Sequence, residues 1–258
     1  MLGASGPTTV TNLRLPPAMR IAVLAPHPDD FDAIGVTLRW FQSRGHRLDV
    51  GVLTTGASGV EDVYRGAVAA DVKRDIREAE QRTSCRFFGL PDNQVTFLRL
   101  LEDDTGHLAP CPANLERLRS FFEALAPQIT FLPHGNDSNP DHQRTAAFFR
   151  EIARACASPV VACFNRDPKT VAMRTDLFIG FDDNDARWKG ELLRCHESQH
   201  QRNLNTRGYG FDERILRVNR RIAAELGGTW PYAESFEVEC LGGSHSGANV
   251  GTSTTHPA

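Results

Sequence analysis

Long apolar runs are missing from this sequence of 258 residues, and residues 1–17 lack a basic segment followed by an apolar core. A helix that crosses a bilayer needs about 20 predominantly apolar residues. A secretory leader needs a basic and an apolar region in that order. We therefore expect a protein with no membrane partner.

A strong net charge is missing as well. The chain carries 29 basic and 32 acidic residues, which gives a formal charge of −3 at pH 7. Because basic and acidic residues are nearly equal in number, the chain as a whole has no general electrostatic attraction to nucleic acid or to an anionic membrane. We expect no nucleic-acid partner and a small neutral ligand instead.

The cysteines include no CxxC pair. Most of them fall inside predicted strands or helices, where cysteine acts as a small apolar residue. We interpret them as reduced thiols of a cytoplasmic protein, because disulfides persist mainly in oxidising compartments. The six are Cys85, Cys111, Cys156, Cys163, Cys195 and Cys240.

Length and composition favour one α/β domain over residues 19–241. With 40% hydrophobic residues, the chain can bury one sizeable core. Alternating strand and helix patterns predict a three-layer, Rossmann-like fold, in which a mostly parallel sheet has helices on both faces. Residues 1–18 are expected to form a flexible lead and the low-complexity residues 242–258 a disordered tail.

The predicted elements follow from hydrophobic periodicity. Strands are expected at residues 21–25, 47–54, 85–90, 128–133, 159–165, 170–181 and, at one edge of the sheet, 235–240. Helices are expected at residues 31–44, 71–84, 112–125, 140–155, 186–199 and 211–226. The polar segment 57–69 is a candidate substrate loop because it follows a strand. Residues 94–112 fit either a short strand or a loop.

The first strand ends abruptly in a group of polar residues. The apolar run Ile21–Ala25 is followed by His27-Pro28-Asp29-Asp30 and then by a helix pattern. Ligands of open α/β sheets bind at the carboxyl ends of the strands, which is where these side chains lie. His27 and Asp30 are three residues apart, so at a helix entry they can face the same point. Such a pair can hold a metal ion.

A second group of polar residues occupies an equivalent place. The predicted strand 128–133 is followed by residues 134–145, which include Asn139-Pro140-Asp141-His142 at the start of a helix. If the two strands are neighbours in a parallel sheet, both groups meet at one crevice. His142 would then join His27 and Asp30, and two histidines with one carboxylate are typical of a catalytic zinc site that keeps a position open for water.

Plainer interpretations remain open at this point. Asn139-Pro140 is also an ordinary helix start, with Asn as the N-cap and Pro at the first helical position. The Asp29-Asp30 pair also fits a magnesium-dependent phosphoryl-binding domain, although His142 would then have no role. Asp32 is interpreted as a first-turn charge, and without further support His196 is interpreted as a structural histidine.

These motifs resemble those of the LmbE-like, or PIG-L, zinc-dependent N-deacetylases. The first signature of that family is matched by Pro26-His27-Pro28-Asp29-Asp30, and the second, usually His-Pro-Asp-His, by residues 139–142. The likeness extends through Thr54-Thr55-Gly56, through Gly89-Leu90-Pro91-Asp92, and through Lys189 followed by His196-Glu197-Ser198-Gln199. It covers residues from about 19 to 225 in the same order.

The resemblance implies a function and roles for individual residues. The enzyme would remove an N-acetyl group from an amino sugar or a related small glycoside, using one zinc ion per chain held by His27, Asp30 and His142. Asp29 would be the general base. The other residues assigned to catalysis are Asn139, Asp141 and His196, and those assigned to substrate binding are Arg65, Asp92, Asp137 and Arg202.

Two positions depart from the family pattern. Asn139 stands where the family usually has histidine; its amide can donate a hydrogen bond to an oxyanion but cannot carry a proton. Asp29 would then do the acid and the base work, or His134, His196 or a substrate group would supply the proton. Phe31 stands where glutamate is common, which is expected to alter local packing only.

Two further expectations stay open from the sequence. A homo-oligomer is compatible with it. The alternative function is a non-catalytic regulatory α/β module that binds a metal ion or a phosphoryl group.

Overall fold

A mixed sheet organises the protein. The structure is a computed structural model that describes residues 6–243, so most of the predicted tail and the first five residues lie outside the described part. In these residues the sheet has eight strands in the order β1-β7-β8-β6-β5-β2-β3-β4. They are β1 (Thr8–Thr9), β2 (Arg20–Ala25), β3 (Arg47–Val52), β4 (Val95–Phe97), β5 (Ile129–Pro133), β6 (Val160–Asn165), β7 (Leu177–Phe181) and β8 (Tyr232–Leu241).

The predicted parallel sheet is confirmed at its centre. Strand β2 pairs in parallel with β3 and with β5, so that Val23 lies opposite both Val50 and Phe131. The predicted neighbourhood of the two motif-bearing strands is therefore correct. Strand β8 is antiparallel to β6 and β7 and lies between them. Its prediction as an edge strand was wrong, because pairing order depends on contacts that its own sequence does not encode.

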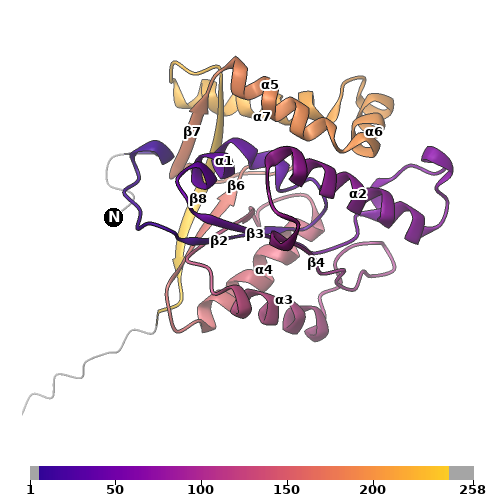
Figure 1. The fold of residues 1–258 in the computed structure, drawn as a ribbon, viewed down its shortest axis with the longest axis horizontal. Helices are drawn as coiled ribbons and strands as arrows, with labels where there is room; N and C mark the ends of the chain where they lie inside the picture. The colour runs from indigo at the N-terminus through magenta and orange to yellow at the C-terminus, as the bar shows by residue number, and fades with distance from the viewer. Residues whose placement is uncertain (1–5, 244–258) are drawn as a thin grey trace, which may run out of the picture.

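Helices cover both faces of the sheet, which confirms the three-layer architecture (Figure 1). They are α1 (Gly35–Ser43), α2 (Ala70–Phe88), α3 (Pro112–Leu125), α4 (Pro140–Ala155), α5 (Asp183–Arg194), α6 (Glu197–Arg207) and α7 (Phe211–Leu226). Side chains alternate between the two faces of a strand. In β2, Val23 packs in the core under α1 and α5, whereas Leu24 packs in the core formed with α3 and α4.

The structure corrects several predicted elements. Residues 85–90 are not a strand: α2 continues to Phe88, because Ser84, Cys85 and Phe88 belong to its buried face, and it ends at Gly89 with φ +86°. The predicted helix 31–44 starts with a 3-10 turn at Asp32–Ile34 before α1.

The remaining corrections concern the ends of elements. The expected flexible lead contains β1, which pairs with β7, followed by Val10 with a fully buried side chain. The strand predicted at 170–181 is confined to β7. The helix predicted at 186–199 is two helices, α5 and α6, that meet at His196.

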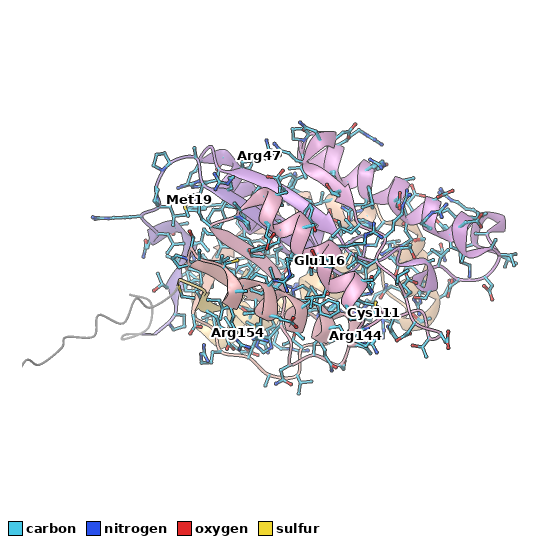
Figure 2. All side chains as sticks on the ribbon, turned by 90° about the horizontal axis from the view of Figure 1, so that it is seen from below. Met19, Arg47, Cys111, Glu116, Arg144 and Arg154 are labelled. Carbon is cyan, nitrogen blue, oxygen red and sulfur yellow. The ribbon has the colours of Figure 1, made fainter. Side chains whose placement is uncertain are left out.

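The carboxyl ends of the central strands lie together at one end of the molecule. In Figure 2, Met19 and Arg47, at the amino ends of β2 and β3, lie far from Cys111 and Arg144. Arg144 is in the first turns of α4, which begins after β5. The two polar motifs therefore lie at the same end of the sheet. Among residues 6–243, none of the helices has both the length and the apolar character needed to cross a membrane.

Candidate active site

A pocket of about 450 Å³ opens at the carboxyl ends of β2 and β5. Its floor contains His27, Asp29 and Asp30 from the segment after β2, and Asn139, Asp141 and His142 from the start of α4. Helices α6 and α7 also contribute to the lining, through Arg202, Asn203, Thr206, Arg207, Phe211, Arg214 and Ile215. The two motifs thus meet in one cavity, as the sequence predicts.

Three side chains in this pocket form a candidate metal site. His27, Asp30 and His142 each offer one ligand atom, and these atoms lie within 4.8 Å of one another. Asp30 Oδ2 is 3.2 Å from His27 Nδ1, and Asp30 Oδ1 is 3.5 Å from His142 Nε2. Two imidazoles and one carboxylate are a donor set that suits zinc and related divalent ions. The residues present therefore fit the predicted metal site.

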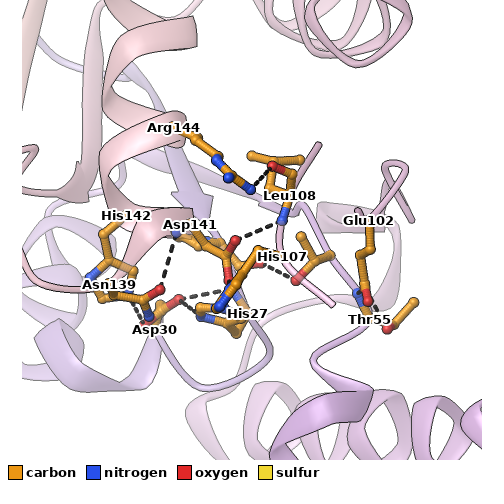
Figure 3. Close-up of polar contacts among 12 residues, drawn as sticks. His27, Asp30, Thr55, Glu102, His107, Leu108, Asn139, Asp141, His142 and Arg144 are labelled. Atoms are coloured by element: carbon orange, nitrogen blue, oxygen red, sulfur yellow. Dashed lines mark hydrogen bonds and ion pairs between the residues drawn. The ribbon is translucent and has the colours of Figure 1, made fainter. Parts of the chain in front are cut away.

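A carboxylate lies next to the outer nitrogen of each imidazole. His27 Nε2 donates a hydrogen bond of 2.8 Å to Asp141 Oδ2 (Figure 3). The buried Nδ1 of His142 lies 3.4 Å from Asp137 Oδ2 and 3.9 Å from Asp167 Oδ1. Carboxylates in this outer position fix the tautomer and the orientation of metal-binding histidines. Asp137, predicted to bind substrate, therefore lies behind His142 and outside the pocket lining of the described residues.

The charges in the site stabilise one another. Burial alone would lower the pKa of His27, but the hydrogen bonds that the ring donates to Asp141 and Asp30 raise that pKa to about 9. Burial opposes ionisation of Asp141 too, yet the bonds to His27 and His107 hold its pKa at about 2. The pKa of Asp30 is well below its usual range, because His142 and His27 outweigh its burial. The floor of the pocket is thus prepared for a cation.

Asp29 has a strained backbone that α2 holds in place. Its φ angle is +114°, which is rare for a residue other than glycine. Gln81 Oε1 accepts a 2.9 Å hydrogen bond from the Asp29 backbone N–H, and Arg77 Nη2 donates a 2.9 Å bond to Asp29 Oδ2. Arg77 also donates to the carbonyl of Pro28. The strain is typical of a functional site, and the structure places Asp29 at the pocket.

Asn139 is the N-cap of α4, as one interpretation of the sequence predicted, and it also lies at the pocket. Its side-chain Oδ1 caps α4 by accepting a 3.1 Å hydrogen bond from the backbone N–H of Asp141. The same residue lines the pocket. Because its oxygen is engaged with the helix, the side-chain amide N–H₂ is the group that can face a ligand, with the orientation assigned from this hydrogen bond.

His196 and Asp32 form a buried pair away from the pocket. Their side chains are fully buried, and His196 Nε2 lies 2.7 Å from Asp32 Oδ2. Asp32 also accepts from Gln81, which in turn holds the backbone of Asp29. Asp32 lies in the first turn of the 3-10 helix Asp32–Ile34, as predicted, but its side chain is buried against His196. His196, assigned to catalysis, does not line the pocket among the described residues and can act only through this chain of contacts.

The predicted substrate residues separate into two groups. Arg202 lines the pocket and donates to the carbonyl of Gly59 in the loop after β3. Arg65 instead pairs with Glu197 in a neighbouring depression. Asp92 is exposed in the 3-10 turn Asp92–Gln94. Among the described residues, neither Arg65 nor Asp92 belongs to the lining of the active-site pocket.

Sequence patterns missed several residues of the site, among them His107 and Arg77. His107 lies in the loop between β4 and α3, lines the pocket, and has its Nδ1 3.0 Å from Asp141 Oδ2. Arg77 lies on the charged face of α2 and is 2% exposed. The only signal for His107 was the turn sequence at residues 103–106 that precedes it, and Arg77 carried no signal at all.

The family of the chain follows from its sequence. Residues 22–153, just over half of the 258, match the family model described as "PIG-L: GlcNAc-PI de-N-acetylase". The chain belongs to the PIG-L family. As a member of this family it is a hydrolytic N-deacetylase, and not the non-catalytic module that the sequence left open. A comparison with curated proteins finds no match.

Solved structures of this fold include several enzymes. N,N'-diacetylchitobiose deacetylase from Pyrococcus horikoshii is 17% identical, with a TM-score of 0.71 over 86% of this chain and 84% of its own. GalB, the 4-carboxy-2-hydroxymuconate hydratase from Pseudomonas putida KT2440, is 19% identical, with a TM-score of 0.65 over 85% and 95%. The zinc-inhibited form of teicoplanin deacetylase Orf2 is 15% identical, with a TM-score of 0.64 over 87% and 100%. These similarities establish the fold.

Proposed function

We propose that this PIG-L family member is a zinc-dependent hydrolase that removes an N-acetyl group from an amino sugar or a related small glycoside. The products are acetate and a free amine. The observation that carries the proposal is the convergence of His27, Asp30 and His142 in one pocket, with Asp29 beside them. This donor set leaves room for water and substrate, which distinguishes a catalytic metal site from a closed structural one.

The metal would be held by His27, Asp30 and His142. Zinc bound in such a site lowers the pKa of a coordinated water to about 7 and polarises a carbonyl oxygen. The outer carboxylates Asp141 and Asp137 keep the two imidazoles in their orientations.

Asp29 is suited to be the general base. Arg77 binds Oδ2 of its carboxylate, and among the described residues no side chain bonds to Oδ1. The free oxygen can therefore take the proton from the attacking water. Asn139 can donate its amide N–H to the oxyanion that forms as water adds to the acetyl carbon, since such donors are most effective in a pocket of low dielectric.

The part of the pocket that α6 and α7 line suits a sugar. Its lining by α6 and α7 includes Arg202, Asn203, Arg207 and Arg214, whose side chains are hydrogen-bond donors for hydroxyl groups. The volume of about 450 Å³ lies within the range of small-molecule sites. The names of the diacetylchitobiose and teicoplanin deacetylases support a sugar-like substrate.

Metal analysis combined with acetate release tests the proposal. We expect about one zinc per chain, and release of acetate from one or more members of a panel of N-acetylated amino sugars. Because Orf2 has a zinc-inhibited form, the activity is measured while zinc is titrated from below one equivalent to a large excess, and with cobalt and nickel in parallel.

Two variants separate binding of the metal from turnover. Asp29→Asn should retain the metal and lose acetate release by at least about 10²-fold, because the general base is absent. Asp183→Asn, at an exposed position in the first turn of α5, is the matched control and should behave as wild type. Normal turnover by Asp29→Asn, or a wild type that binds zinc but releases no acetate from any substrate of the panel, would contradict the proposal.

A further inference from the structure

The leaving amine needs a proton that Asn139 cannot supply. Amide hydrolysis breaks the C–N bond, and the electron pair stays on nitrogen, which must be protonated as it leaves. Asn139 stands where the resemblance to the family leads one to expect a histidine, and an asparagine amide has no proton to transfer. A different group of this chain must therefore carry the proton, unless Asp29 does both tasks.

The pocket offers few histidines for this role. Among the described residues, those that line it are His27, His107 and His142. Two of these form the candidate metal site. The other two histidines considered from the sequence lie elsewhere: His196 is buried against Asp32, and His134 faces Glu237 at a distance of 3.5 Å. Among the histidines of the described residues, this leaves His107.

The position of His107 suits a proton donor. Its Nδ1 donates a 3.0 Å hydrogen bond to Asp141 Oδ2, the same oxygen that accepts from His27 Nε2 (Figure 3). The opposite ring nitrogen, Nε2, is then available for a ligand. The side chain is 36% exposed, so the ring can exchange protons with solvent. Asp141 is the carboxylate that orients the ring, and its negative charge compensates the charge of an imidazolium.

The loop that carries His107 is held at many points. Arg144 of α4 donates to the Asp103 carboxylate and to the carbonyl of Leu108, at 2.7 and 2.6 Å. The backbone N–H of Leu108 donates a 2.6 Å bond to Asp141 Oδ1. Within the loop, the His107 N–H donates to Asp103. These bonds fix the imidazole on the same carboxylate that fixes His27, which is the preorganisation that proton transfer requires.

We propose that His107 donates the proton to the leaving amine, in place of the histidine that Asn139 replaces. This inference rests on the proposed function. Asp29 takes one proton from water as the oxygen adds to the acetyl carbon. When the C–N bond breaks, the proton on His107 Nε2 moves to the amine nitrogen, and the neutral imidazole is protonated again from solvent or from Asp29. The sum is one water consumed, with acetic acid and the amine formed, which ionise to acetate and an ammonium ion at neutral pH.

His107→Gln is the variant that tests this role. Its side-chain amide can still donate a hydrogen bond to Asp141, but it cannot transfer a proton. We expect kcat to fall by about 10²- to 10⁴-fold, the usual contribution of a general acid, while KM, zinc content and melting temperature stay near those of wild type. His200→Gln is the matched control, because His200 is 28% exposed, faces the carboxylate of Asp212 at 3.4 Å and lies outside the pocket lining of the described residues. This variant should keep its activity within about threefold.

Two rescue measurements distinguish proton transfer from a positioning role. Adding Asn139→His to His107→Gln restores the histidine that is usual in the family signature and should raise kcat at least about tenfold. Free imidazole should also restore activity to His107→Ala, since the pocket is open to solvent, whereas it would not repair a displaced Asp141.

The outcomes separate the two proposals. If wild type releases acetate and His107→Gln is equally active, the role of His107 is refuted and the proposed function stands. If His107→Gln is inactive and neither rescue restores it, His107 only positions Asp141 and the inference is wrong. If wild type releases no acetate from any substrate of the panel, the proposed function fails and this inference fails with it.

Discussion

Replacement of Arg77 by methionine should lower both the stability of the protein and its rate of acetate release. Arg77 is 2% exposed and pairs with Asp29, which is 13% exposed. Methionine preserves much of the side-chain volume but leaves the Asp29 carboxylate and the Pro28 carbonyl without their donor. Removal of one partner of a buried ion pair costs about 3–5 kcal/mol. For a chain of this size that corresponds to a fall in melting temperature of roughly 6–20 °C.

Arg77→Met should also slow acetate release, for a reason separate from its lower stability. Arg77 and Gln81 help to hold the Asp29 segment, whose φ angle of +114° is strained and must be maintained by its surroundings. Without Arg77, the carboxylate of the proposed base loses its orientation, and we expect acetate release to slow at least about tenfold at a temperature where the variant is still folded.

A matched control lies one turn earlier on α2. Arg74 pairs with Asp75, which is 66% exposed, so Arg74→Met should change the free energy of unfolding by at most about 1 kcal/mol. Denaturant unfolding and initial rates are measured on both variants at the same zinc concentration. If Arg77→Met matches Arg74→Met in both, Arg77 does not hold the active-site segment and the reasoning is refuted.

Other predictions concern the metal site and its neighbourhood. In the metal-free protein the pKa of His27 is about 9, above its value of about 6.5 in an unfolded chain. The stabilisation that this shift provides is complete below pH 6.5 and is lost as the pH rises through 9. Zinc needs neutral rings at both His27 and His142, and although burial lowers the pKa of His142, Asp30 and Asp137 raise it well above its usual value. The zinc affinity, measured by chelator competition, should therefore rise at least about tenfold per pH unit from 6.5 to 9; a flat profile would contradict the assignment. Asp137→Asn weakens the contact that orients His142 and should reduce zinc affinity about 10- to 100-fold, and unchanged affinity would remove Asp137 from the site. Gly56→Ala should lower the melting temperature, because Gly56 has φ +62° and a Cβ there would lie 2.9 Å from Pro28 Cδ; a stable, active variant would show that this approach is not required.

The metal site could be predicted because its signal is local. An apolar run that ends at proline locates the end of β2, and Asn139-Pro140 marks the start of α4, so the places of His27, Asp30 and His142 follow from short segments. The pairing of β2 with β5 then brings the three side chains together. Helices α3 and α7 could be predicted with their exact ends, since Pro112 begins one and Gly227 follows the other.

The support for the site could not be predicted because it depends on distant pairs. Asp32 and His196 are 164 residues apart, and nothing near either residue indicates the other. Helix α2 has the composition of a solvated helix, yet it buries Arg77 and Gln81 against the active-site segment and Glu80 against Ser198 of α6. Charged residues on a helix usually indicate an exposed face. Here that inference fails because their partners lie on other elements.

The position of β8 has a consequence for biosynthesis. This strand is the last described element of the chain, yet it lies between β6 and β7 and joins the part of the sheet that contains β1 and β7 to the rest. During translation, β7 can therefore not be linked to β6 until residues 232–241 have left the ribosome. Contacts between segments so far apart in sequence form slowly, so the nascent chain should present exposed sheet edges to chaperones until its final strand inserts.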